Sequence, residues 1–284
     1  MTPWDDRPCE LGEGALWHPG RAQLYWFDIL QGRLHTVEDD APRTYDLGEM
    51  ASAAGWIDDG ALLVATQSAL RRLDLATGTL ETVVPLEAEN DVTRSNDGRA
   101  DPWGGFWIGT MGKKAEHGAG AIYRYHGGEL RRLHGAISIP NAICFAADGR
   151  HAHFVDTPTH VVMRQPLDPE TGWPAAEAEP HLDLNGTGRR PDGAIVDAEG
   201  NLWIAEWGGG RVTCNAPDGT LLRSFEVDGE HTTCPALGGP DLTTLYVTTA
   251  RQGLPQAHLS DPVQGCTFAI PGAGRGRPEP RVIL

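Results

Sequence analysis

The chain has 284 residues, of which 40% are hydrophobic and 22% are charged, a balance typical of a globular protein rather than a disordered one. Its formal net charge of −16 argues against nucleic acid or an anionic membrane as a partner, since both favour basic surfaces. Its five cysteines are scattered without CxxC spacing, which favours buried thiols in a reducing compartment over a disulfide framework.

The N-terminal residues MTPWDDRPCELGEG lack the apolar core of a signal peptide, and no later run approaches the ~18 apolar residues of a membrane span. We therefore expect a soluble cytoplasmic protein with no nucleic-acid or membrane partner. A single domain over residues 1–284 is expected, because all-β domains often reach this length.

Short apolar runs separated by Gly, Asp and Pro turns follow one another along the chain, and helical periodicity is hard to find. A turn followed by a short, mostly aromatic strand occurs in HPGRAQLYWFDI, DDGALLVAT, DPWGGFWIGT, AADGRHAHFVDT, DAEGNLWIAEW and GPDLTTLYVTTA. The spacings are 38, 44, 47, 49 and 43 residues when these copies are aligned on Tyr25, Leu63, Trp107, Phe154, Trp203 and Tyr246. A period of ~40–50 residues is typical of propeller blades. We predict an all-β, six-bladed β-propeller, in which the C-terminal pieces CTFAI and RVIL supply strands that complete the ring with N-terminal ones.

Polar side chains recur at one place in this repeat, eleven to thirteen residues before each aligned strand position. The residues found there are Glu13, Ser52, Asn96, Asn141, Asp192 and Pro235. Equivalent positions of successive blades surround the propeller axis, so the carboxylate and carboxamide side chains among them should converge at one mouth of the channel. Two such carboxylates would repel each other unless a cation lay between them.

Oxygen ligands of this kind are preferred by Ca²⁺, Mg²⁺ and Mn²⁺, and Fe²⁺ and Zn²⁺ also accept them. Three or four protein ligands leave positions open for water or substrate, which is the pattern of a catalytic metal site. The alternative for each residue alone is a structural one, because Asn and Asp before a strand are ordinary turn formers. For Arg94, near this position, the alternative is a surface ion pair with the acidic segment 87–91.

Five segments together resemble the motif series of the SMP-30/gluconolactonase/LRE family, the regucalcin-like sugar lactonases. They are LGEGALWHPGRAQLYWFDI, RSNDGRADPWGGFWIGTM, IPNAICFAADG, RPDGAIVDAEGNLWIAEW and GGPDLTTLYVTTAR, in the family's order between about residues 10 and 255. The resemblance implies a six-bladed propeller that holds one divalent metal ion through Glu13, Asn141 and Asp192. It also implies that Arg94 and Asn96 contact the substrate or metal-bound water.

The chain departs from the family pattern at three places. Ala15 stands where the family often has Pro, and Ala142 follows Asn141 where Gly is usual. After GTM, where some members use an acidic residue to hold the sugar, this chain has two lysines and then an acidic residue. We expect Lys114 and Glu116 to contact the substrate there.

The reaction that the resemblance implies is metal-dependent hydrolysis of a sugar lactone to its aldonic acid. A metal ion would polarise the lactone carbonyl, and Asp192 is the expected general base for the attacking water. Two alternatives stay open: a non-catalytic, calcium-binding regulatory propeller, and a related hydrolase of esters or phosphotriesters. A monomer is expected, because a closed propeller needs no partner.

Overall fold

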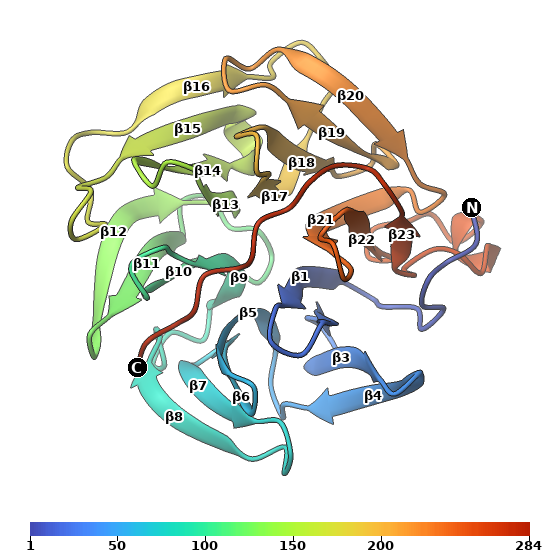
Figure 1. Cartoon of the computed structure of the whole chain (residues 1–284), viewed down its shortest axis with the longest axis horizontal. Coiled ribbons are helices and arrows are strands. Elements are labelled where there is room, and N and C mark those ends of the chain that lie inside the picture. Colours follow the sequence, from blue (N-terminus) through green and yellow to red (C-terminus); the bar gives the residue numbers. More distant parts are fainter.

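The computed structural model describes all 284 residues, which form six small antiparallel sheets arranged in a ring (Figure 1). This arrangement confirms the predicted all-β, six-bladed propeller. Within each blade the strand that comes first in the sequence is the innermost one, and each innermost strand contacts the innermost strands of both neighbouring blades. These six inner strands therefore surround the propeller axis.

The strands of each blade follow one another from the axis to the rim. Blades 1 to 3 consist of β1 (Gly12–His18), β2 (Gln23–Asp28), β3 (Arg33–Glu38) and β4 (Ala41–Asp46); β5 (Ala51–Asp58), β6 (Ala61–Thr66), β7 (Ala69–Asp74) and β8 (Leu80–Pro85); and β9 (Thr93–Ala100), β10 (Phe106–Gly112), β11 (Gly120–His126) and β12 (Glu129–Ile137). Blades 4 to 6 consist of β13 (Pro140–Phe145), β14 (His151–Asp156), β15 (Val161–Pro166) and β16 (Glu179–Asp183); β17 (Pro191–Val196), β18 (Leu202–Glu206), β19 (Arg211–Asn215) and β20 (Leu221–Glu226); and β21 (His231–Gly238), β22 (Thr244–Ala250) and β23 (Phe268–Ile270). Two short 3₁₀ helices, η1 (Thr157–Thr159) and η2 (His258–Ser260), lie in loops. At three residues each, neither could span a membrane.

The second strand of each blade is buried on both faces, because a blade packs between two neighbours. The side chains of Trp26, Trp107 and Trp203 on β2, β10 and β18 are completely buried. The outer strands β4 and β20 instead expose most of their residues to water. The aromatic runs of the sequence repeat thus form the contacts between blades, which is why they repeat with the blade period.

Every innermost strand carries an extra residue near its first residues, relative to the strand with which it pairs, and β5 carries a second one near its last residues. Such a β-bulge bends the strand and re-aims the side chains beside it. In blades 1 and 4 the bulge places Gly14 and Ala142 in the left-handed region, with φ of 58° and 54°. A Cβ on Gly14 would lie 2.1 Å from the carbonyl oxygen of Ser52, so only glycine fits there. Ala142 adopts the same conformation at a cost of about 1 kcal/mol or more.

The ring closes by pairing between the two ends of the chain, as the sequence predicts for CTFAI. This segment contributes β23, and the preceding Thr267 pairs with Asp5 through N–H···O=C bonds of 3.1 Å in both directions. The prediction that RVIL forms a further strand is wrong. Pro278 and Pro280 immediately before it lack the N–H groups that a paired strand needs.

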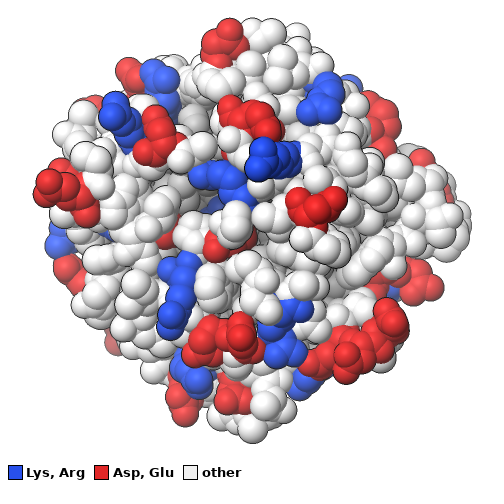
Figure 2. All heavy atoms as spheres, in the orientation of Figure 1, with Lys and Arg blue, Asp and Glu red and all other residues white.

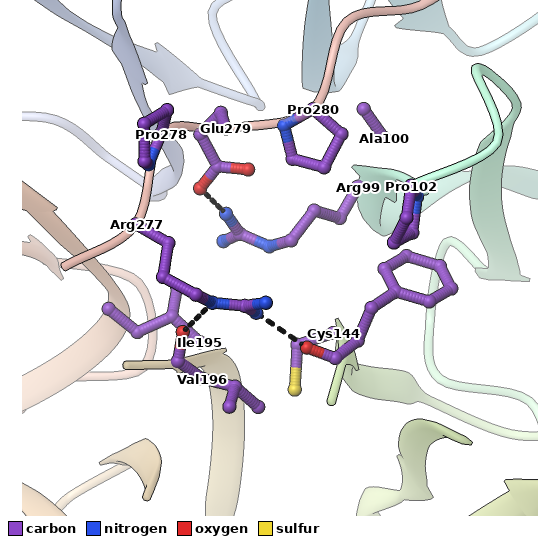
Figure 3. Close-up of a pocket in the computed structure, with 11 residues that line it drawn as sticks. Arg99, Ala100, Pro102, Cys144, Ile195, Val196, Arg277, Pro278, Glu279 and Pro280 are labelled. Atoms are coloured by element: carbon purple, nitrogen blue, oxygen red, sulfur yellow. Dashed lines mark hydrogen bonds and ion pairs between the residues drawn. The ribbon is translucent and has the colours of Figure 1, made fainter. Parts of the chain in front are cut away.

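Residues 271–284 instead form a strap that crosses one end of the propeller axis (Figure 1). Val282 of the strap is completely buried, and its N–H donates to the carbonyl of Trp56 at 2.8 Å. Arg277 Nη2 donates to the carbonyl of Phe145 at 2.7 Å, and Arg99 pairs with Glu279, enclosing a cavity of about 50 Å³ (Figure 3). Figure 2 shows this face with acidic and basic side chains interspersed. The strap therefore covers this end of the axis.

Candidate functional site

A larger pocket, of about 470 Å³, lies at the opposite end of the axis. Strand β9 shows the relation between the two ends: Arg94 and Asn96 line the large pocket, whereas Arg99 and Ala100 line the small cavity beneath the strap. The residues that line the large pocket are Leu11, Glu13, Arg94, Asn96, Met111, Lys113, Lys114, Ala115, Ile139, Asn141, Thr157, Arg190, Asp192, Trp207, Gln252 and Gly253. Carboxylate, amide and guanidinium groups from blades 1, 3, 4 and 5 meet there, next to the β-bulges of these blades.

The structure brings six of the seven predicted site residues to this pocket. They are Glu13, Arg94, Asn96, Asn141, Lys114 and Asp192. Glu116 does not line the pocket, because its side chain folds back on its own turn and accepts the N–H of Lys114 at 3.0 Å. A short Gly-Lys-Lys turn leaves backbone donors that an acidic side chain two residues on can satisfy locally.

Two of the six repeat positions also lie outside the pocket. Ser52 turns inward and donates its hydroxyl to Ser95 Oγ at 2.8 Å. Pro235 follows the bulge of β21 instead of lying within it, since the extra residue falls between Thr232 and Pro235. The alignment on aromatic strands is therefore shifted in blade 6, where the pocket is lined by Gln252 and Gly253 instead.

Arg94 is buried at the pocket floor, with 5% of its surface exposed, so the alternative of a surface ion pair with segment 87–91 is wrong. Its Nη1 donates to Asn96 Oδ1 and to the carbonyl of Ser95, both at 2.8 Å. Burial lowers the pKa of Arg94 to about 10, while Glu13 and Asp192 favour its charged form. Arg94 is thus a fixed cation that faces two carboxyl groups.

Glu13 and Asp192 form a pair of buried carboxyl groups, with 6% and 5% of their surfaces exposed. Burial raises the pKa of both, and repulsion from Asp97 raises both further. The Glu13 carboxylate also raises the pKa of Asp192. Arg99 favours the ionised form of Asp97, whereas Arg94 alone favours the ionised forms of Glu13 and Asp192, so the pair itself has an excess of negative charge when both are ionised.

Two amide side chains beside this pair are held in fixed orientations by a chain of hydrogen bonds. Asn96 Nδ2 donates to Asn141 Oδ1 at 2.8 Å, and Asn141 Nδ2 donates to Thr157 Oγ1 at 2.9 Å. The Thr157 hydroxyl then donates to the carbonyl of Pro191 at 3.0 Å. This series of hydrogen bonds joins blades 3, 4 and 5. It leaves one lone pair of Asn141 Oδ1 free, because a carbonyl oxygen can accept two hydrogen bonds.

Asp97 and Thr157 belong to this constellation but were not singled out from the sequence. Asp97 follows Asn96 directly, and strand alternation predicts that neighbours point to opposite faces. The Asp97 carboxylate accepts the N–H of Ile143 at 2.7 Å, and burial raises its pKa to about 6. Asp97 could have been found from the sequence, because it lies in the motif SNDG beside Asn96. Nothing in the local sequence marks Thr157 as part of the site.

The donor set fits a hard divalent cation. Two ionisable carboxyl groups and one amide oxygen are the ligand types that such ions prefer, and the excess negative charge would be offset by a +2 ion. No three His, Cys, Asp or Glu side chains are grouped so that they could hold a metal by themselves. The amide oxygen of Asn141 would therefore be needed to complete a set of three protein ligands.

The raised pKa values predict how stability depends on pH in protein freed of divalent ions. The carboxyl pair contributes stability below the ordinary pKa values of Glu and Asp, and loses it as pH rises through the raised values. The free energy of unfolding, measured by urea titration, should therefore decrease between pH 5 and pH 8. This decrease should be larger in the native protein than in the double variant Glu13→Gln/Asp192→Asn. Equal pH dependence of the two proteins would contradict the pair's raised pKa values.

Comparison with known proteins gives one consistent result. A family model described as SMP-30/Gluconolactonase/LRE-like region matches residues 11–251. A solved structure described as a calcium-binding protein, regucalcin, from Agrobacterium tumefaciens str. C58 is 42% identical, covers 99% of this chain and 97% of that chain, and has a TM-score of 0.96. The 6-deoxy-6-sulfogluconolactonase of Pseudomonas putida is 36% identical over 94% of both chains. Pentonolactonase XacC of Haloferax volcanii is 34% identical over 96% of this chain and 95% of its own.

Proposed function

We propose that this chain, which belongs to the SMP-30/gluconolactonase/LRE-like family, hydrolyses sugar lactones to aldonic acids. The observation that carries the proposal is the meeting of Glu13, Asn141 and Asp192 with Arg94 and Asn96 in one pocket. Relatives named as a 6-deoxy-6-sulfogluconolactonase and a pentonolactonase support a sugar lactone as the substrate class.

Glu13, Asn141 and Asp192 are the residues that would hold one divalent metal ion, with Ca²⁺, Mn²⁺, Mg²⁺, Zn²⁺ and Fe²⁺ as candidates. A bound ion would supply Lewis-acid polarisation of the lactone carbonyl and compensate the charge of the oxyanion. Support comes from the excess negative charge of the site and from the free lone pair of Asn141 Oδ1.

Asp192 is the proposed general base, which takes the proton of the attacking water. Burial and the neighbouring acidic groups raise its pKa, and a carboxylate of raised pKa is a stronger base than an exposed one. Asp192 and its neighbour Glu13 both line the pocket, so water within it can reach either group.

Arg94 and Asn96 would orient the sugar. Arg94 uses Nη1 for its protein partners, and its remaining N–H groups can donate to a lactone oxygen or hydroxyl. Asn96 is fixed by donating to Asn141 and to the carbonyl of Pro140 at 2.9 Å. Because both residues are held before substrate arrives, little ordering would remain for the reaction itself.

The cellular setting is also part of the proposal. All five cysteines are free and buried, which supports a reducing compartment such as the cytoplasm. The closed ring leaves no exposed edge at its axis, which supports a monomer. The net charge of −16 supports a small-molecule partner rather than nucleic acid or membrane.

The test is proton release from a panel of pentono- and hexonolactones, with spontaneous ring opening subtracted. A simple aryl ester and a phosphotriester serve as competing substrates. We expect sugar lactones to be hydrolysed with the highest kcat/KM. Faster turnover of the ester or phosphotriester would favour the related hydrolase, and no turnover by protein shown to bind metal would favour a regulatory calcium-binding propeller.

A further inference from the structure

The large pocket is cationic in a protein that is otherwise strongly acidic. The chain has a net charge of −16 and only two lysines, Lys113 and Lys114, and both line this pocket. Two arginines, Arg94 and Arg190, line it as well. Apart from the carboxyl groups of Glu13 and Asp192, no acidic side chain lines it.

These cations are arranged in two levels. Arg94 lies buried at the floor beside the carboxyl pair, which favours its charged form. Lys113 is half-buried, and Lys114 and Arg190 are exposed. The upper level therefore lies on the solvent side of the pocket, at its mouth.

None of the three mouth cations pairs with a carboxylate of the protein. The only hydrogen bond from their side chains is from Lys113 Nζ to the carbonyl of Asp91, at 2.9 Å. Lys113 and Lys114 follow β10 in blade 3, and Arg190 precedes β17 in blade 5. They thus approach the pocket from the two blades that flank blade 4, and a ligand on the axis would lie between them.

We propose that the pocket selects lactones that carry an anionic group, such as a phosphate, sulfonate or carboxylate, on the carbon farthest from the lactone carbonyl. This inference rests on the proposed function, since it takes the carbonyl to lie at the carboxyl pair. A substrate with its carbonyl at Asp192 places its far end at Lys113, Lys114 and Arg190. An anion would otherwise be repelled by a protein of this net charge, so the mouth cations offset that repulsion where the substrate enters.

The expected preference follows from what partly exposed ion pairs contribute. Each such ion pair strengthens a binding equilibrium by about 1.4- to 5-fold. For three cations together we therefore expect kcat/KM to be about tenfold higher for the anionic substrate. The advantage should shrink as salt rises from 20 mM to 500 mM, because salt screens exposed charges.

The experiment compares D-glucono-1,5-lactone with its 6-phosphate, which differ only in the anionic group. The ratio of their kcat/KM values should be about 10 for the native protein and about fivefold lower for Lys113→Gln/Lys114→Gln. The charge reversal Lys113→Glu/Lys114→Glu should bring the ratio below 1. Arg132→Gln/Arg223→Gln is the matched control, because it also removes two positive charges, from exposed positions on the outer strands β12 and β20, and it should leave the ratio unchanged.

Calorimetric binding of gluconate and 6-phosphogluconate separates this inference from the proposed function. A ratio near 1 with both lactones hydrolysed, or a ratio that the lysine variants do not change, would overturn the inference and leave the lactonase standing. No hydrolysis of either lactone, with 6-phosphogluconate still bound about tenfold more tightly by a lysine-dependent interaction, would support the anion site and reject the lactonase. Equal binding of the two acids without hydrolysis would overturn both.

Discussion

Replacing Asp192 with Asn should lower kcat for lactone hydrolysis by about 10²- to 10⁴-fold, the usual contribution of a general base. The amide has nearly the same size as the carboxyl group but cannot accept the proton of the attacking water. Asp192 is buried in the bulge of β17, where its pKa is raised because burial disfavours its charged form. The neutral variant should therefore fold at least as stably as the native protein when both lack metal.

This pairing of lost turnover with retained stability is the signature of a functional residue. It is measured by the initial rate of lactone hydrolysis and by urea unfolding of the same preparations. Glu129→Gln serves as a control, because Glu129 is an exposed residue of β12 whose carboxylate pairs only with Arg131. An Asp192→Asn protein that keeps native kcat would remove Asp192 from the chemistry.

Replacing Glu13 with Gln should weaken the binding of the divalent ion by about 100-fold or more. The change removes one of the two carboxylates whose charge would offset the ion, in a buried site where charges interact strongly. Calorimetric titration measures the affinity directly. Thermal unfolding gives a second reading, since an ion at 100 times its Kd should stabilise the native protein by about 2.7 kcal/mol and the variant by much less.

A matched control for Glu13→Gln is Glu10→Gln, which removes an exposed carboxylate three residues earlier that does not line the pocket. Its titration should match that of the native protein. Indistinguishable titrations of native protein and Glu13→Gln would show that Glu13 does not hold the ion.

The repeat in the sequence predicted the propeller because turns and aromatic strands recur with the blade period. Those aromatic residues, such as Trp107 and Trp203, fill the space between blades, where blade 2 uses aliphatic residues such as Leu63. The same period placed Glu13, Asn141 and Asp192 near one another, because equivalent positions in a closed ring share one end of the axis.

The bulges explain why the prediction of the ring was inexact. The extra residue near the start of each inner strand changes which side chains point to the axis, so Asp97 lies close enough to raise the pKa of Glu13 while its neighbour Asn96 lines the pocket. Pro235 misses the pocket for the same reason. Strand alternation read from the sequence has no signal for such a shift.

Apart from Lys114, the residues at the mouth of the pocket could not be predicted, because loops of different blades form it. Arg190, Trp207 and Gln252 belong to connections whose paths depend on the neighbouring blades. The local sequence did not indicate that the carboxylate of Glu116 accepts a backbone N–H of its own turn and does not line the pocket. The strap was missed as well, since a segment without strand pairing has no sequence period.

The most direct test of the account is lactone hydrolysis by protein stripped with a chelator and then reloaded with Ca²⁺, Mn²⁺, Mg²⁺, Zn²⁺ or Fe²⁺ in separate samples. We predict that stripping abolishes enzyme-dependent proton release and that one of these ions restores it, with Glu13→Gln requiring far more of that ion. Full activity in protein shown to be free of metal would contradict the proposed role of Glu13, Asn141 and Asp192.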